Sequence, residues 1–130
     1  MDSGVRQNDE IPGVPELTNL ISFDIDGTLE VGDPPGIITI ARVREALALG
    51  YIIGSCSDRT VGCQQRMWEQ HGVPVSFTVL KHRLDEVKAQ FSAGQYFHIG
   101  DTNIDKHYAE RNGFVYFYPD ASIDHLWTPR

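Results

Sequence analysis

Two carboxylates in close spacing stand out near the start of the chain. An apolar, β-prone run is followed by two aspartates, a glycine and a threonine in residues 21–28, ISFDIDGT. If the backbone stays extended through Asp26, the side chains of Asp24 and Asp26 share a face. Two like charges so close repel each other unless a proton or a cation lies between them. The spacing therefore predicts a metal site after a buried strand, and the alternative is a simple Asp-Gly turn.

Polar side chains follow several later apolar runs in the same way. Such runs at residues 52–56, 77–80 and 96–99 precede the polar groups Ser57, Arg59, Lys81, Asp101 and Asp105. In open α/β sheets ligands bind outside the carboxyl ends of the strands, so we expect these groups to meet at one edge. Carboxylate oxygens suit Mg²⁺, and an ammonium and a hydroxyl group suit a phosphoryl group.

Four motifs resemble the signatures of the haloacid dehalogenase-like (HAD) superfamily. Residues 23–29, FDIDGTL, resemble the first signature, DxDGT, and residues 98–105, HIGDTNID, resemble GDxxxD. The second signature is a Ser or Thr after a strand, for which Ser57 in SCSDR is the preferred candidate and Ser55 the alternative. The third is a Lys, for which Lys81 is preferred to Lys88, which lies deeper in a predicted helix. The resemblance covers about residues 20 to 118.

The resemblance implies a Mg²⁺-dependent phosphatase that hydrolyses a phosphate monoester. Asp24 would attack phosphorus to form an aspartyl-phosphate, and Asp26 would act as general acid and base. Asp24, the backbone carbonyl of Asp26, and Asp101 would bind the metal. The phosphoryl group would be held by Ser57, Lys81, Gly27 and Thr28, and supporting roles would fall to Asp105, Asn103 and Arg59.

The same resemblance indicates to which branch of the superfamily the sequence is most similar. Dehalogenases lack an aspartate two residues after the nucleophile, so Asp26 favours the phosphate-hydrolysing branches. The intervals between residues 29 and 57 and between 57 and 81 are too short for a cap domain, which predicts a capless enzyme with an open site. An open site of this kind would accept either a phosphorylated macromolecule or a phosphorylated small molecule. A small molecule would be covered by a neighbouring subunit of a homo-oligomer. A phosphotransferase and a catalytically silent binding module are the alternatives.

Alternating strand and helix patterns predict the elements that position these groups. We expect strands at 20–24, 51–56, 77–80, 96–99 and 114–118. Helices are expected from Thr39 to Gly50 and at 60–70, 83–91 and 103–112, with Val61, Met67 and Trp68 facing inward in the second. This order predicts an α/β fold, a Rossmann-like three-layer sandwich whose five-stranded, mainly parallel sheet has the order 3-2-1-4-5.

Length and composition set further expectations. With 130 residues the chain fits one domain at 19–130 after a flexible N-terminal arm at 1–18. A net charge of −7 argues against non-specific nucleic-acid binding, and the two cysteines match no zinc pattern. The sequence lacks the roughly 20-residue apolar run of a membrane span and the layout of a signal peptide, so we expect a cytoplasmic protein.

Two segments outside the regular elements also carry expectations. Residues 30–36, EVGDPPG, are rich in turn-forming residues and predict a short loop or hairpin beside the acids, like a small flap. Residues 119–130 form a tail, and we expect its Leu126 and Trp127 to dock on the body of the protein.

Overall fold

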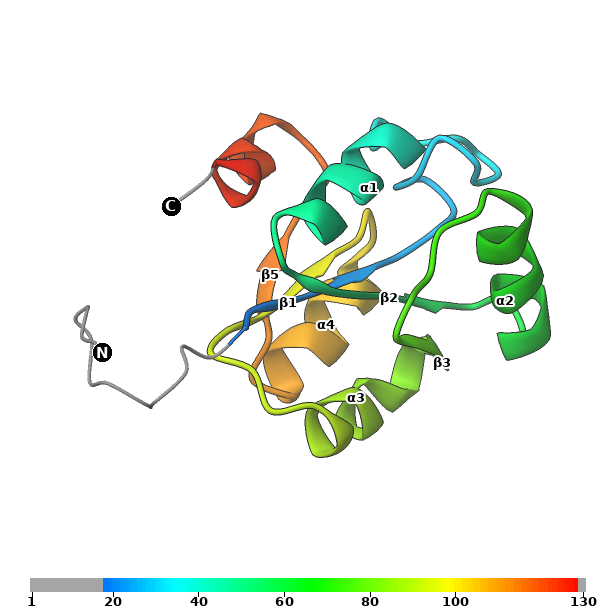
Figure 1. Cartoon of the computed structure of the whole chain (residues 1–130). Coiled ribbons are helices and arrows are strands. Elements are labelled where there is room, and N and C mark those ends of the chain that lie inside the picture. The colour runs from blue at the N-terminus through cyan, green and yellow to red at the C-terminus, as the bar shows by residue number, and fades with distance from the viewer. Residues whose placement is uncertain (1–17, 129–130) are drawn as a thin grey trace.

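A five-stranded parallel sheet forms the centre of the protein. The computed structural model describes residues 18–128, and its strands have the order β3-β2-β1-β4-β5 (Figure 1). They are β1 (Leu20–Phe23), β2 (Ile52–Ser57), β3 (Phe77–Leu80), β4 (Tyr96–Ile99) and β5 (Val115–Phe117). All neighbouring strands pair in parallel. The predicted fold class and strand order are therefore confirmed, while the predicted N-terminal arm lies outside the described residues except for Thr18.

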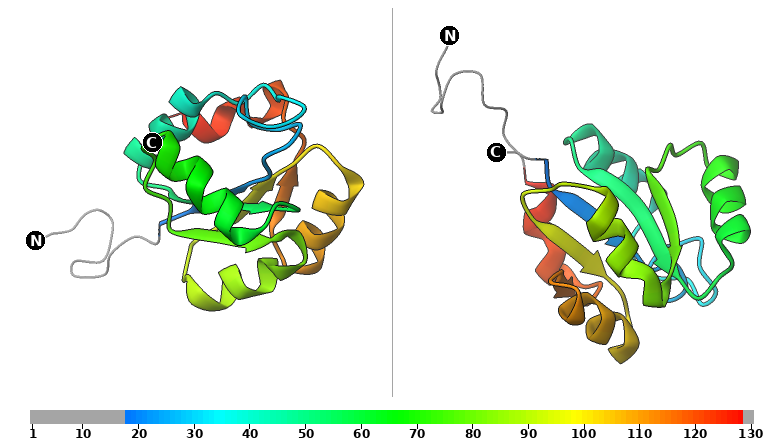
Figure 2. Two further views of the ribbon diagram at one scale, coloured as in Figure 1. Left: turned by 90° about the vertical axis from the view of Figure 1, so that its right-hand side faces the viewer. Right: turned by 90° about the horizontal axis from the view of Figure 1, so that it is seen from below.

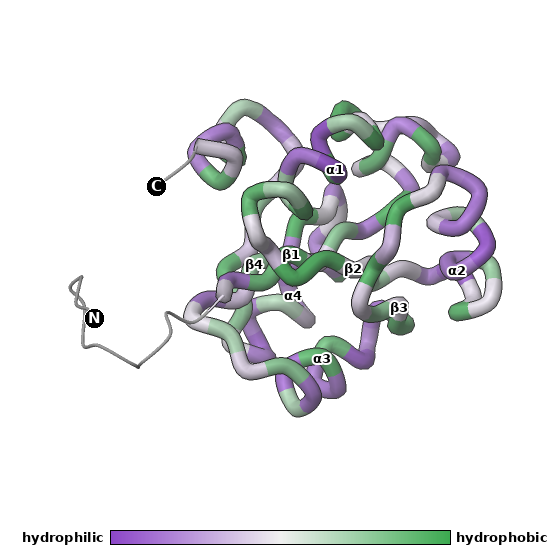
Figure 3. Tube along the Cα trace, in the orientation of Figure 1, coloured by the Kyte–Doolittle hydropathy of each residue, from purple (hydrophilic) through white to green (hydrophobic). Residues whose placement is uncertain are grey.

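Helices cover both faces of this sheet. They are α1 (Ile40–Ala48), α2 (Val61–Gln70), α3 (Leu84–Gln90) and α4 (Asn103–Arg111), with 3₁₀ turns η1 (Lys81–Arg83) and η2 (Ala121–Trp127). One apolar core contains residues of α1, α2 and η2, and a second contains residues of α3 and α4. The two views in Figure 2 show these layers on opposite sides of the strands. Figure 3 shows hydrophobic residues at the start of β2, whereas the helices carry both hydrophobic and hydrophilic residues.

The helix boundaries follow from capping residues that the sequence already shows. Thr39 caps α1 by accepting a hydrogen bond from the Arg42 N–H, and Thr60 caps α2 by accepting one from the Cys63 N–H. The residue after the C-cap of α1, Gly50, has a positive φ of 99°, as expected where a helix ends. These helices therefore begin and end close to the predicted positions.

The predicted inner face of α2 is correct at two of three positions. Met67 and Trp68 are buried, but Val61 is 37% exposed, and the third buried residue of the helix is Gln64. Gln64, Met67 and Trp68 are three and four residues apart and so share one stripe of the helix. The amide of Gln64 is tolerated there because it bonds Ser55 Oγ at 2.6 Å and the carbonyl of Val79 at 3.0 Å.

Two boundaries differ from the prediction near the acids. The first strand ends at Phe23, one residue before Asp24. The third helix is preceded by the 3₁₀ turn η1, so that Lys81 belongs to a separate turn and α3 begins only at Leu84. Asp24 therefore lies just outside the strand, and Lys81 lies in the short turn between β3 and α3.

The loop at residues 30–36 lies beside the acids, as predicted. Two backbone hydrogen bonds hold it against the turn after β1. The N–H of Gly27 donates to the carbonyl of Pro34 at 2.6 Å, and the N–H of Gly36 donates to the carbonyl of Leu29 at 2.8 Å. The N–H of Asp33 donates to Asp26 Oδ1 at 2.8 Å. The loop therefore contacts the acidic turn directly.

The C-terminal segment docks on α1, as predicted. Leu126 is buried, and Trp127 Nε1 donates to the carbonyl of Arg42 at 2.6 Å. The guanidinium of Arg42 lies 4.3 Å from the centre of the indole ring, which also packs against Phe23. Within residues 18–128 every helix is too short or too polar to cross a bilayer.

Candidate functional site

Three aspartates meet at the carboxyl edge of the two central strands. Phe23 of β1 pairs with Ile99 of β4, so Asp24 and Asp101 leave neighbouring strands close together. The backbone N–H of Asp24 donates to the carbonyl of Ile99 at 2.9 Å. Carboxylate oxygens of Asp24, Asp101 and Asp105 all lie within 4.8 Å of one another. Asp24 and Asp101, two of the three predicted metal ligands, therefore lie together. Asp105, which was predicted only as a supporting residue, also belongs to the cluster, whereas the carboxylate of Asp26 does not.

Two glycines allow the carboxylates to approach so closely. A Cβ atom on Gly27, which has φ of 79°, would lie 2.0 Å from Asp101 Oδ2. A Cβ atom on Gly100 would lie 2.2 Å from the Cγ of Asp105. Both distances are far inside van der Waals contact, so a larger residue at either position would displace an acid of the cluster. The glycines of the two aspartate motifs thus shape the site itself.

Lys81 is the cation of this cluster. Its Nζ lies 3.6 Å from Asp24 Oδ1 and 3.5 Å from Asp105 Oδ2, and all three side chains are buried. Asp58 Oδ2 is a third neighbour at 3.6 Å, from an exposed side chain. Burial alone would lower the pKa of Lys81, but the three carboxylates outweigh it and raise the pKa. Lys81 is therefore charged and is shared among the acids.

The alternative lysine lies elsewhere. Lys88 is exposed on α3, where its Nζ donates to the carbonyl of Asn112 at 3.0 Å and lies 5.2 Å from the centre of the Tyr96 ring. The structure therefore brings Lys81 to the aspartates and leaves Lys88 at the surface.

The acids of the cluster differ in protonation. Burial, and after it the charge of Asp105, raise the pKa of Asp24 to about 8, with Lys81 acting in the opposite direction. Burial also acts to raise the pKa of Asp105, but hydrogen bonds from His98 and Thr102 and the charge of Lys81 lower it overall. The surroundings therefore favour the protonated form of Asp24 when no cation is bound, and the ionised form of Asp105.

Asp101 supplies the strongest sign that a cation fits here. Among the buried side-chain nitrogen and oxygen atoms of residues 18–128, Asp101 Oδ1 is the one without a hydrogen-bond partner. A buried carboxylate oxygen is costly to leave unpaired. An oxygen-rich cluster with one unsatisfied oxygen matches the ligand preference of hard divalent cations, so the residues present could hold such an ion.

Asp26 departs from the predicted arrangement. Its side chain does not share a face with Asp24, because the strand ends at Phe23 and Asp26 lies in a turn. Instead Asp26 Oδ1 accepts hydrogen bonds from Arg59 Nη2 at 2.7 Å and from the N–H of Asp33 at 2.8 Å. Partial burial acts to raise the pKa of Asp26, but these bonds and the charge of Arg59 lower it overall.

The two serines of β2 have different surroundings. Ser55 Oγ bonds Gln64 Oε1 at 2.6 Å and accepts from Trp68 Nε1 at 3.0 Å, which ties it to α2 and away from the acids. Ser57 is the last residue of β2, and its Oγ accepts a hydrogen bond from the N–H of Arg59 at 3.1 Å. Of the two, Ser57 is the hydroxyl at the carboxyl edge of the sheet.

The remaining predicted residues lie around the turn after β1 and at the start of α4. The backbone N–H of Gly27 donates to the carbonyl of Pro34, and the backbone N–H of Thr28 donates to the carbonyl of Ile25 at 3.1 Å. Thr28 Oγ1 donates to Asp24 Oδ2 at 3.3 Å, so this side chain contacts the predicted nucleophile. Asn103 is exposed in the first turn of α4.

Three further residues of the site were not predicted. His98 and Ser22 form a buried hydrogen-bonded chain that leads to Asp105, and Asp58 is the third neighbour of Lys81. The signal for the first two was a polar residue inside an apolar run at each of positions 22 and 98. For Asp58 the only signal was its position between Ser57 and Arg59.

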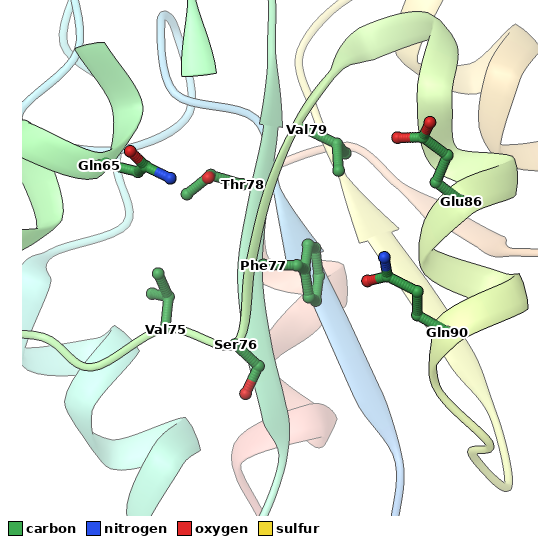
Figure 4. Close-up of a pocket in the computed structure, with 8 residues that line it drawn as sticks. All are labelled: Gln65, Val75, Ser76, Phe77, Thr78, Val79, Glu86 and Gln90. Atoms are coloured by element: carbon green, nitrogen blue, oxygen red, sulfur yellow. The ribbon is translucent and has the colours of Figure 1, made fainter. Parts of the chain in front are cut away.

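A pocket of about 370 Å³ lies away from this cluster, along the edge strand β3 (Figure 4). Phe77 and Val79 of β3 line it together with Glu86 and Gln90 of α3. None of the predicted site residues lines the pocket, so we place the candidate site at the aspartate cluster.

Comparisons of the chain with protein-family models, with curated proteins and with solved structures gave no match.

Proposed function

We propose that this protein is a Mg²⁺-dependent phosphatase of the HAD type that hydrolyses a phosphate monoester through an aspartyl-phosphate on Asp24. The observation that carries the proposal is the position of Asp24. It follows the central strand β1, shares a cluster with Asp101, and lies 3.6 Å from the ammonium of Lys81. A carboxylate needs such a cationic setting to attack phosphorus in an anionic ester.

The cation site would be formed by Asp24, Asp101 and the backbone carbonyl of Asp26. The unpaired Asp101 Oδ1 supports this ligand set, and Asp105 is less suited because its oxygens already accept from His98 and Thr102. Bound Mg²⁺ supplies charge neutralisation for the acids and the phosphate, and favours ionised Asp24.

The proposed mechanism assigns a residue to each chemical step. An oxygen of Asp24 attacks phosphorus, the bond from phosphorus to the leaving oxygen breaks, and Asp26 gives that oxygen a proton. Water next attacks the aspartyl-phosphate, Asp26 takes a proton from the water, and phosphate and free Asp24 are released. Lys81 and Ser57 hold the phosphoryl oxygens through both steps.

The contact between Asp26 and Arg59 adds a condition to this mechanism. Hydrogen bonds from Arg59 keep Asp26 ionised, which suits the general base of the second step. To act as an acid in the first step, Asp26 must take up a proton while beside a guanidinium, which is unfavourable. Esters whose leaving groups need little protonation should therefore react fastest.

Release of phosphate from an aryl phosphate, with and without Mg²⁺, tests the proposal. We expect Mg²⁺-dependent turnover that Asp24→Asn lowers by at least about a hundredfold, because the amide is a far weaker nucleophile. Asp85→Asn, at an exposed position of α3, is the matched control and should keep full activity.

Two other outcomes would point to the alternatives. Phosphorylated products after addition of an alcohol would identify a phosphotransferase. Mg²⁺ binding without turnover of any phosphorylated compound in a broad panel would indicate a binding module and contradict the proposal.

A further inference from the structure

A chain of buried hydrogen bonds runs beneath the aspartate cluster. The ring of His98 in β4 lies between Ser22 of β1 and Asp105 of α4. His98 Nδ1 is 3.0 Å from Ser22 Oγ, and His98 Nε2 is 2.9 Å from Asp105 Oδ1. All three residues have 0% exposure. Ser22 and His98 are direct partners in the pairing of β1 with β4, so the sheet itself sets the first contact.

Packing alone does not require a histidine at this position. Both neighbours of His98 in β4, Phe97 and Ile99, are apolar core residues, and a buried polar ring is costly unless its nitrogens are bonded. Here both ring nitrogens are bonded, so the cost is offset. The side chain that gains a defined orientation from this arrangement is Asp105.

The two oxygens of Asp105 have separate partners. Oδ1 faces His98, whereas Oδ2 accepts from Thr102 Oγ1 at 2.7 Å and from the Thr102 N–H at 3.1 Å, and lies 3.5 Å from Lys81 Nζ. Because an ionised carboxylate only accepts hydrogen bonds, the proton between His98 and Asp105 belongs to Nε2. The hydroxyl of Ser22 then bonds the other ring nitrogen.

We propose that His98 is a positioning residue: by donating from Nε2 to Asp105 Oδ1, with Ser22 holding its other nitrogen, it keeps Asp105 as the counter-ion of Lys81. Without this donor, Asp105 Oδ1 would be a buried acceptor with no partner, and the carboxylate would rotate to find one. Rotation would take Oδ2 away from Lys81. Lys81 would lose one of its two buried partners.

The positioning role of His98 can be tested by measuring how accessible the Lys81 amine is to a reagent. Limited acetylation followed by peptide mapping gives the ratio of modification at Lys81 to that at Lys106, an exposed lysine on α4 that serves as an internal reference. We expect a low ratio in the wild type and a several-fold increase in His98→Leu. In His98→Gln, whose amide keeps an N–H donor for Asp105, the ratio should return most of the way to the wild-type value.

A second variant keeps the test possible if the His98→Leu protein does not fold. Ser22→Ala removes only the far end of the chain of hydrogen bonds, and should raise the ratio in the same direction by less. Equal ratios in the wild type and in folded His98→Leu and Ser22→Ala proteins would overturn the proposal. An increase in His98→Gln as large as that in His98→Leu would also overturn it, because loss of packing rather than loss of the donor would then be the cause.

The consequence for turnover depends on the proposed phosphatase function. Loss of a residue that orients a site group typically costs about 10- to 100-fold in activity, so we expect kcat for an aryl phosphate to fall by that factor in His98→Leu and to recover in His98→Gln. If the wild type shows no turnover, the phosphatase proposal fails, while the acetylation ratios still decide the role of His98.

Discussion

Arg59 Nη2 lies 2.7 Å from Asp26 Oδ1, and this ion pair joins the segment after β2 to the turn after β1. Arg59 Nε also donates to both oxygens of Asp26, at 3.2 and 3.3 Å, so the guanidinium contacts the carboxylate through two nitrogens. Paired contacts of this kind fix orientation as well as charge. The carboxylate proposed as general acid and base is therefore held in one position and kept ionised.

Arg59→Gln should change how the rate depends on the leaving group. Without the guanidinium, the pKa of Asp26 rises toward its ordinary value, so Asp26 protonates a poor leaving group more readily. We expect the ratio of kcat/KM for an alkyl phosphate to that for a nitrophenyl phosphate to increase in Arg59→Gln. An unchanged ratio would show that Arg59 does not control Asp26. Arg66→Gln, at an exposed position of α2, is the control and should leave the ratio as in the wild type.

Mg²⁺ should raise the melting temperature of the wild-type protein. A ligand that binds only the folded state stabilises it, and here the cation also relieves repulsion among the acids. We expect an increase of about 3 °C or more at millimolar Mg²⁺, measured by circular dichroism. Asp101→Asn should lose most of the shift and the exposed Asp85→Asn should keep it. A shift of the same size in Asp101→Asn would place the cation elsewhere.

Stability without divalent cations should fall as the pH rises from about 4 to about 8. Asp24 ionises at 3.8 in an unfolded chain but has a pKa of about 8 in the folded protein. Between these values the folded state holds a proton that the unfolded state has released, so the free energy of unfolding decreases with increasing pH. Asp26 and Asp105, whose pKa values are lowered, lose their contribution only as the pH falls toward and below 4.

Melting temperatures in EDTA between pH 5 and 8.5 measure this dependence. The decrease with pH should be smaller in Asp24→Asn, because the amide does not titrate. Identical slopes for the two proteins would assign the pH dependence to other groups.

The two aspartates of the first motif should have separable roles in turnover. Asp26→Asn can neither protonate the leaving oxygen nor activate water, but a good leaving group needs little protonation. With a nitrophenyl phosphate the variant should still form the aspartyl-phosphate and then hydrolyse it slowly. Mass spectrometry after rapid acid quenching should find one added phosphoryl group, on Asp24. A phosphoryl group on Ser57 or on a histidine would contradict the mechanism.

The order of the elements and the edge at which the acids meet could both be predicted from the sequence. Alternating apolar runs and helix caps such as Thr39 are local signals, and the right-handed crossover leaves few topologies for five parallel strands. Parallel strands end at the same edge of the sheet, and that edge is where we expected Asp24, Lys81 and Asp101, which each follow a strand. Their meeting was therefore predictable from motif positions alone.

The side chain that each polar group contacts could be found only in the folded protein. Asp26 turned out to face Arg59 because β1 ends at Phe23, and the alternation expected of a longer strand stopped there. His98 occupies an apolar run, and its partners Ser22 and Asp105 come from two other elements. Such pairings depend on the distances between segments that are far apart in the chain. Local sequence patterns carry no information about those distances.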